Sequence, residues 1–216
     1  MDERAALLEE IATEMRCTAQ WTGRATLSPR VAAALGKVRR GAFVPGDAEW
    51  AAYQNRPLPI GCGQTISQPY IVALMTELLD LQPKDKVLEV GTGSGYQAAV
   101  LAELVPTVYS IETIAELTRR AGEALASEGY SNVVLRVGNG ALGWPEEAPF
   151  DTIIVTAAAE TVPPALLQQL GPGGRMIIPV GPQHRDQKLI LIARDERGEI
   201  AQREVLHVAF VPLTGG

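Results

Sequence analysis

The sequence predicts an α/β protein with a doubly wound, mostly parallel sheet that carries helices on both faces. From about residue 81 onward, short apolar runs of strand length alternate with stretches in which apolar residues recur at helical spacing. Before that point the pattern is mostly helical, with turns between the helices. Near the end, two apolar runs joined through residues 195–198 predict a hairpin, and therefore an antiparallel C-terminal strand.

The individual elements follow from these runs in chain order. In the N-terminal part, Ser28 followed by Pro29 is typical of a helix start, and Gly41 is typical of its end. Residues 55–63 are rich in Pro and Gly and predict irregular structure, and a further helix is expected over residues 69–79. Later strands are expected at 86–90, 108–111, 133–137, 150–155, 175–179, 189–192 and 205–211. Helices are expected among them at 96–104, 115–127 and 164–170.

The composition suits one compact unit, in which residues 1–80 form an N-terminal helical extension and residues 81–216 form the core. The 216 residues are 46% hydrophobic, and their net charge of −6 argues against binding to nucleic acid or an anionic membrane. No apolar run has membrane-spanning length, and the acidic N-terminus is unlike a signal peptide, so we expect a cytoplasmic monomer. No metal is expected, because the cysteines and histidines form no ligand pattern: Cys17, Cys62, His184 and His207.

The most informative segment is a glycine-rich turn, Gly91-Thr-Gly-Ser-Gly95, which follows an expected strand and opens a helix. Bare backbone N–H groups at such a turn can approach a ligand closely. The glycine spacing differs from that of the dinucleotide fingerprint, and bulky Tyr96 stands where a small residue would close the helix packing. No Gly-Lys-Ser/Thr follows, so the turn is not a P-loop. A pyrophosphate cradle is therefore disfavoured.

Two further strand ends complete a candidate nucleoside site. Glu112 ends the next strand, where a carboxylate can accept hydrogen bonds from both hydroxyls of a ribose. The third strand ends in Gly138-Asn139-Gly140, where a polar side chain could reach an adenine amino group. Each feature alone also suits a solvated side chain or an ordinary turn. Together they are typical of an adenosine site without a phosphate clamp, as S-adenosylmethionine requires.

Several motifs then resemble those of known enzymes. The glycine turn, Glu112 and residues 150–155 resemble the class I methyltransferases, and Gly63-Gln-Thr-Ile-Ser-Gln-Pro-Tyr70 resembles the signature of the protein-L-isoaspartate O-methyltransferases. Further matches are Phe43-Val-Pro45, Thr156-Ala-Ala158, Leu170-Gly-Pro-Gly-Gly174, Pro179-Val-Gly181 and Phe210-Val-Pro-Leu-Thr214. The resemblance covers nearly the whole chain. It implies a Rossmann-like methyltransferase core, with a segment in residues 1–80 that covers substrate and cofactor.

The resemblance also implies an activity, methyl transfer from S-adenosyl-L-methionine to the α-carboxylate of L-isoaspartyl residues in damaged peptides and proteins. The methyl ester then goes on to a succinimide. Carried over from the family, Ser67 contacts the reacting carboxylate and is the expected catalytic residue. Where the family usually has Gly-Asp-Gly, Asn139 keeps a carbonyl acceptor for adenine but lacks the charge. The expected cofactor-binding residues are Gln64, Thr65, Ile66, Gly91, Thr92, Gly93, Ser94, Gly95, Glu112, Gly138, Asn139 and Thr214.

The residues alone leave alternatives open. Ser67 also suits the N-cap of the helix that begins at Pro69. Another methyltransferase on the same cofactor is the main rival, although Thr156-Ala-Ala-Ala159 stands where a nitrogen methyltransferase would favour Asn-Pro-Pro-Tyr. A nicotinamide-dependent oxidoreductase is disfavoured by Tyr96 and by the lack of a Tyr-x-x-x-Lys motif. A non-catalytic binding module that keeps the fold is favoured only by Asn139.

Overall fold

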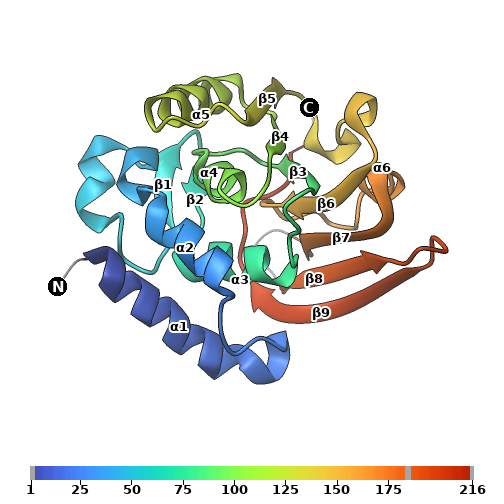
Figure 1. Cartoon of the computed structure of the whole chain (residues 1–216). Helices are drawn as coiled ribbons and strands as arrows, with labels where there is room; N and C mark the ends of the chain where they lie inside the picture. Colours follow the sequence, from blue (N-terminus) through green and yellow to red (C-terminus); the bar gives the residue numbers. More distant parts are fainter. Residues whose placement is uncertain (1–2, 183–185, 215–216) are drawn as a thin grey trace.

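The computed structural model describes residues 3–182 and 186–214, so His184 lies outside the described residues. Its main sheet has seven strands in the order β5-β4-β3-β6-β7-β8-β9 (Figure 1). Strands β3 to β7 run parallel to one another, whereas β8 runs antiparallel to both β7 and β9. The predicted sheet is therefore confirmed. The strands are β3 (Lys86–Val90), β4 (Thr107–Glu112), β5 (Val133–Val137), β6 (Phe150–Val155), β7 (Leu170–Val180), β8 (Gln187–Arg194) and β9 (Ile200–Val208).

Helices cover both faces of this sheet, as predicted. One face packs against α1 (Glu3–Thr22), α2 (Pro29–Lys37), α3 (Pro69–Leu78), α4 (Tyr96–Ala102) and α5 (Ala115–Ser127). The other face packs against α6 (Pro164–Gln169). Neighbouring residues of β3 point to opposite faces, so Val87 lies in the first apolar cluster and Leu88 in the second. No helix in the described part of the chain is both long and apolar enough to cross a membrane.

Short 3-10 helices link the larger elements. The N-terminal part contains η1 (Arg40–Phe43) and η2 (Gly46–Ala51), and the segment before β6 contains η3 (Gly140–Leu142) and η4 (Pro145–Glu147). The predicted N-cap is confirmed, because the Ser28 hydroxyl accepts a hydrogen bond from the N–H of Val31 at 3.3 Å. The predicted end at Gly41 is wrong. The backbone becomes extended at Val38, so α2 stops at Lys37 and Gly41 lies within η1.

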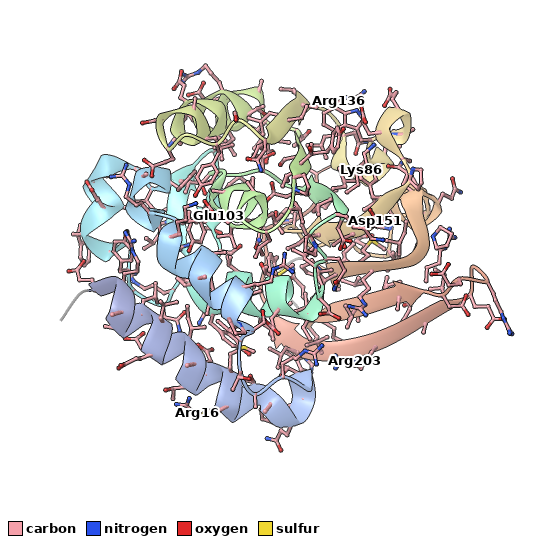
Figure 2. The ribbon with its side chains drawn as sticks, in the orientation of Figure 1. Arg16, Lys86, Glu103, Arg136, Asp151 and Arg203 are labelled. Atoms are coloured by element: carbon pink, nitrogen blue, oxygen red, sulfur yellow. The ribbon has the colours of Figure 1, made fainter. Side chains whose placement is uncertain are left out.

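The N-terminal helices are tied to the core by hydrogen bonds as well as by packing. Arg203 lies on β9 and is labelled in Figure 2. Its guanidinium donates to the carbonyl oxygens of Trp21 at 3.2 Å and Thr22 at 3.1 Å, where α1 ends. Arg30 on α2 donates to the carbonyl oxygens of Leu81 at 2.8 Å and Leu104 at 2.9 Å. The helices of the N-terminal part therefore pack at fixed positions against the sheet.

The prediction of irregular structure over residues 55–63 is wrong in part. Strand β1 (Leu58–Gly61) pairs antiparallel with β2 (Gln64–Ile66) in a separate hairpin. Its turn is made by Gly61, Cys62 and Gly63, all with positive φ. Pro59 is tolerated because a two-stranded hairpin leaves one edge of each strand unpaired. Leu58 and Ile60 alternate inward, so burial of apolar side chains outweighs the local Pro and Gly content.

The C-terminal strands also differ from the predicted bounds. Strand β7 was expected over residues 175–179 but begins at Leu170, directly after α6. Its first residue pairs with Phe150, and the register then shifts before Arg175 pairs with Thr152. The irregular register falls in the glycine-rich residues 171–174, between the expected helix at 164–170 and the expected strand at 175–179. Strand β9 ends at Val208, so residues 209–211 continue beyond the strand that was expected to contain them.

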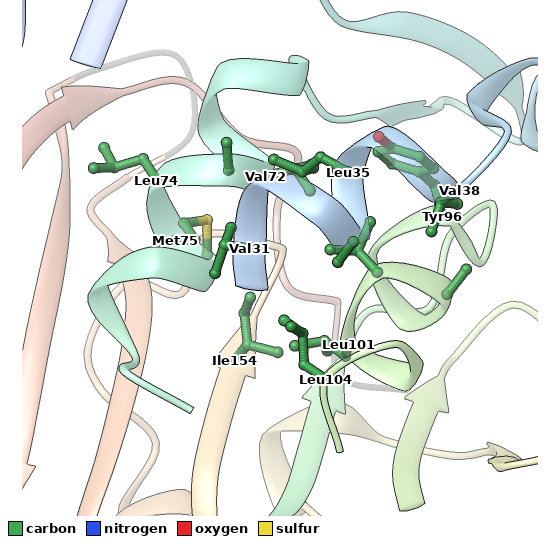
Figure 3. Close-up of a cluster of buried hydrophobic side chains, with 14 of the residues drawn as sticks. Val31, Leu35, Val38, Val72, Leu74, Met75, Tyr96, Leu101, Leu104 and Ile154 are labelled. Atoms are coloured by element: carbon green, nitrogen blue, oxygen red, sulfur yellow. The ribbon is translucent and has the colours of Figure 1, made fainter. Parts of the chain in front are cut away.

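Ile154 offers a test of the larger apolar cluster. It is fully buried near the end of β6, within the cluster that Figure 3 shows together with Val31 and Leu104. We expect Ile154→Ala to lower the free energy of unfolding by about 2–5 kcal/mol, because a cavity replaces most of the side chain. Urea unfolding measures the change. Ile200→Ala, at a position 36% exposed on β9, is the control, and an equal loss in both variants would contradict the assignment.

Candidate active site

A cavity opens where β3, β4 and β6 end. Strand β3 lies between β4 and β6, and the helices that follow β3 and β6 pack on opposite faces, which is where α/β sheets bind ligands. The cavity encloses about 720 Å³, including space open to solvent, which is the size of a small-molecule site. Ten predicted site residues line it, namely Gln64, Thr65, Ile66, Ser67, Gly91, Thr92, Gly93, Ser94, Glu112 and Thr214.

The glycine turn after β3 leaves no room for a side chain at its first position. Gly91 has a φ of 97°, and a Cβ there would lie 2.4 Å from Oγ1 of Thr156. Thr156 follows β6, and its hydroxyl donates to the carbonyl oxygen of Gly91 at 2.6 Å. Glycine is therefore required at position 91 because the end of β6 packs directly on the turn.

Glu112 holds the same turn from the end of β4. Its two carboxylate oxygens accept hydrogen bonds from the N–H of Gly93 at 2.9 Å and from the N–H of Ile114 at 3.0 Å. Glu112 is 7% exposed and lines the cavity. Each carboxylate oxygen has a further lone pair, so Glu112 can accept both hydroxyls of a ribose while it fixes the turn.

Beneath the turn, a chain of hydrogen bonds runs from Thr92 through Ser110 to Glu89. The hydroxyl oxygens of Thr92 and Ser110 are 2.6 Å apart, and the Ser110 hydroxyl donates to a carboxyl oxygen of Glu89 at 2.5 Å. Burial raises the pKa of Glu89 to about 8; the Ser110 hydrogen bond opposes this rise, and the charge of Glu112 adds to it. Glu89 is therefore mostly protonated at neutral pH.

Ser67 lies where the cavity meets a second hollow. This groove is bounded by the start of α3 and by residues 207–211, and Thr65, Ser67, Thr156 and Val211 line both hollows. Within the described ranges, the Ser67 hydroxyl makes no hydrogen bond, so it is available to a ligand. The alternative assignment of Ser67 as the N-cap of α3 is wrong, because Gln68 occupies that position.

The segment after β9 returns to the cavity and forms another of its walls. The N–H of Ala158 donates to the carbonyl oxygen of Val211 at 2.8 Å, and the N–H of Leu213 donates to the carbonyl oxygen of Ala158 at 2.7 Å. These two bonds fix the segment against the loop that follows β6. Thr214, an exposed residue, follows directly and lines the cavity, and its contact with the cofactor stays a prediction.

Three predicted cofactor residues do not line the cavity. Gly95 faces α5, where a Cβ would lie 3.2 Å from that of Ala121. Gly138 and Asn139 are not among the lining residues, although the next residue, Gly140, is. The Asn139 side-chain carbonyl accepts a hydrogen bond from the N–H of Ala141 at 2.9 Å and caps η3. The side chain of Asn139 thus has a local role, and its contact with adenine stays a prediction.

Further residues that were not predicted to bind the cofactor also line the cavity. Most are apolar residues from several elements, and the sequence carried a signal for two of them. Val90 and Ile111 end the same two strands that supply the turn and Glu112, so their position at the sheet edge could have identified them. These further lining residues are Val72, Val90, Tyr96, Gln97, Ile111, Thr113, Ile114, Gly140, Thr156, Ala157, Val211, Pro212 and Leu213.

A nucleoside without phosphate groups fits this site better than a nucleotide does. None of the described residues that line the cavity is Lys or Arg, so no side chain there would neutralise a phosphate. Glu112 offers a carboxylate to a ribose, and Gly91 allows close approach to backbone. In the described part of the chain, no three His, Cys, Asp or Glu side chains gather where they could hold a metal ion. The fold and the site define a methyltransferase that uses S-adenosyl-L-methionine as its methyl donor.

Comparisons with known proteins identify the family. The family model for protein-L-isoaspartate(D-aspartate) O-methyltransferase matches residues 15–216. The chain is 56% identical to protein-L-isoaspartate O-methyltransferase 2 of Syntrophobacter fumaroxidans, over 99% of this chain and 86% of the relative. It is also 56% identical to protein-L-isoaspartate O-methyltransferase 2 of Polaromonas sp., over 97% of this chain and 99% of the relative. The chain belongs to the protein-L-isoaspartate(D-aspartate) O-methyltransferase family.

A solved structure supports both the fold and the cofactor. A protein from Plasmodium falciparum assigned to the same family was crystallised in complex with S-adenosyl-L-homocysteine. It matches this structure with a TM-score of 0.82 at 25% identity, and the match covers 100% of both chains. The match therefore extends beyond the sheet to the N-terminal helices and to the segment after β9.

The role of Glu112 can be tested by binding. We expect Glu112→Ala to weaken binding of S-adenosyl-L-homocysteine by about 10–100-fold, because the turn and the ribose both lose a charged acceptor. Isothermal titration calorimetry measures the affinity. Glu116→Ala is the matched control, because Glu116 is exposed on α5 and its carboxylate pairs with Arg119, away from the cavity lining. A dissociation constant within threefold of the wild-type value would contradict the assignment.

The protonation of Glu89 predicts an unusual pH dependence of stability. Between about pH 4.5 and pH 8 the folded protein keeps this proton while the unfolded chain releases it, so Glu89 lowers the free energy of unfolding as the pH rises. The slope from one such group is at most about 1.4 kcal/mol per pH unit. Glu89→Gln cannot ionise, so its stability relative to wild type should rise by about 2–4 kcal/mol from pH 5 to pH 8.

Urea unfolding at several pH values measures this difference. Glu10→Gln, on the exposed side of α1, is the control for the loss of one carboxyl group. Parallel stability curves for the Glu89→Gln variant and the wild type would show that Glu89 is ionised in the folded state.

Proposed function

We propose that this protein repairs damaged polypeptides by methylating the α-carboxylate of L-isoaspartyl residues. The observation that carries the proposal is the position of Ser67, which lines both the cofactor cavity and the adjoining groove. A peptide carboxylate in the groove would meet a donor in the cavity at this residue. Family membership supports the same activity.

The chemistry matches the uncharged character of the site. A carboxyl group with an ordinary pKa of about 3.9 is ionised at neutral pH, so the nucleophile needs no general base. When bound, S-adenosyl-L-methionine supplies an electrophilic methyl group on a sulfonium. A carboxylate oxygen forms a bond to this carbon as the carbon–sulfur bond breaks, which gives a methyl ester and S-adenosyl-L-homocysteine. Later attack by the neighbouring backbone nitrogen on the ester, with loss of methanol, gives a succinimide.

The main task of the protein is then alignment, which can contribute about 7–11 kcal/mol to such a reaction. The Ser67 hydroxyl can donate to one carboxylate oxygen and leave the other to react. A cation in direct contact would stabilise the ionised substrate more than the transition state, in which charge is neutralised. Gln64, Thr65 and Ile66 come from β2, and Thr214 comes from the segment after β9, so two separate elements cover the cofactor.

Several properties of the whole protein belong to this proposal. Residues 1–80, which include the β1–β2 hairpin, pack on residues 81–216 as one compact unit and cover substrate and cofactor. The protein acts as a monomer on isoaspartyl peptides and proteins, and not on nucleic acids or membranes. Cys17 and Cys62 are exposed free thiols, which supports a reducing, cytoplasmic location.

Methyl transfer to matched synthetic peptides tests the function. Labelled S-adenosyl-L-methionine is incubated with the protein and with peptides that differ only in L-isoaspartate or L-aspartate. Base-labile label on the isoaspartyl peptide alone is the expected result. Cofactor binding without label on either peptide would refute the proposed activity and favour a different acceptor.

Ser67→Ala tests the orienting role. The loss of one hydrogen bond to a charged group corresponds to about 10–100-fold in kcat/KM for the isoaspartyl peptide. Binding of S-adenosyl-L-homocysteine should change little. Ser127→Ala, at the exposed end of α5, is the control. An unchanged kcat/KM in the Ser67→Ala variant would refute the role.

A further inference from the structure

Arg40 is a fully buried cation in the N-terminal part of the chain. It begins η1, its relative exposure is 0%, and within the described residues it pairs with no carboxylate. Burial lowers the pKa of its guanidinium to about 10, so the group is charged at neutral pH. A buried charge without a counterion costs stability unless its hydrogen bonds are excellent. One of its nitrogens, Nη1, has no hydrogen-bond partner within the described ranges, which makes the placement of this residue costly.

The guanidinium joins three backbone positions on either side of the β1–β2 hairpin. Its Nε donates to the carbonyl oxygen of Ala52 at 2.9 Å. Its Nη2 donates to the carbonyl oxygen of Ser67 at 2.8 Å and, at 3.5 Å, to that of Arg56. The planar fork of an arginine can hold such separate acceptors in one fixed geometry, which a lysine cannot do. The hydrogen bond to its carbonyl oxygen thus fixes the backbone of Ser67 from the interior of the protein.

The same guanidinium also contacts Tyr96, the residue that follows the glycine turn. Its central carbon lies 4.9 Å from the centre of the Tyr96 ring, in a cation–π contact. Tyr96 is the first residue of α4 and lines the cofactor cavity. Phe43 packs edge-on against the same ring, with 5.9 Å between ring centres. Arg40 therefore contacts both a residue of the cofactor wall and the residue that faces the substrate groove.

We propose that Arg40 is a positioning residue for methyl transfer, which sets Ser67 at a fixed place relative to the cofactor turn. The proposal rests on the proposed function, because it needs Ser67 to orient the substrate carboxylate. Arg40 acts from within the protein and touches neither substrate nor cofactor. Its loss would leave the site assembled but would release the Ser67 backbone, and a misplacement of about 1 Å can cost about 100-fold in rate.

Arg40→Lys and Arg40→Met test the proposal in the full chain. We expect kcat for the isoaspartyl peptide to fall by about 10–100-fold in both variants. The dissociation constant for S-adenosyl-L-homocysteine should stay within about threefold in Arg40→Lys. The matched controls are Arg39→Lys and Arg39→Met, because Arg39 is the adjacent arginine but is mostly exposed and pairs with Glu128. These controls should keep wild-type kcat.

A double-mutant cycle separates positioning from a general structural role. If Arg40 acts through Ser67, Arg40→Lys should reduce kcat much less in a Ser67→Ala background than in the wild type. Additive losses would overturn the proposal. So would a kcat within twofold of wild type in folded Arg40→Lys, or failure of both Arg40 variants to fold, which would assign the residue to stability alone.

The assay of the wild-type protein distinguishes a failure of this proposal from a failure of the proposed function. If the wild-type protein does not methylate the isoaspartyl peptide, the proposed function fails before Arg40 is considered. If the wild type is active and Ser67→Ala abolishes activity while the Arg40 variants retain it, only the positioning role fails. Circular dichroism and thermal unfolding of each variant establish that it is folded at the assay temperature.

Discussion

The site depends on a steric constraint: the first position of the turn after β3 has no room for a side chain. Thr156 occupies the space that a side chain at Gly91 would need, and it is held there by a hydrogen bond to the turn itself. Glu112 then binds the exposed N–H of Gly93, and a buried chain through Thr92 supports the turn from below. Three neighbouring strands thus meet at one short segment, which has little freedom to move when a ligand binds.

Much of this arrangement was predictable, because it depends on local pattern. The apolar runs specify the strands, and the right-handed connections of a parallel sheet place the ends of β3 and β4 side by side. The sequence alone therefore places the glycine turn and Glu112 in one site, and both line the cavity. Ser67 could be assigned only from the resemblance of its segment to a known signature, since an isolated serine carries no signal of its own.

What could not be predicted depends on contacts between distant segments. The hairpin of β1 and β2 forms because Leu58 and Ile60 are buried by the rest of the molecule, against the tendency of the neighbouring Pro and Gly. In the sequence, Arg40 is one of two adjacent arginines. No local pattern predicts that Arg40 is buried while Arg39 is exposed. The hydrogen bond from the N–H of Ala141 to the Asn139 side chain was likewise not indicated by the sequence, and the contact of Asn139 with adenine stays a prediction.

The segment after β9 has a consequence for biosynthesis. Its residues 211–214 form a wall of the cavity, yet they are synthesised after every strand of the sheet. While the chain is still growing on the ribosome, the cavity lacks this wall, and a ligand makes fewer contacts there than in the finished protein. Stabilisation by mass action depends on affinity, so the cofactor stabilises the folded state most after residues 211–214 have been synthesised. Before that point the sheet depends more on its own burial of apolar surface.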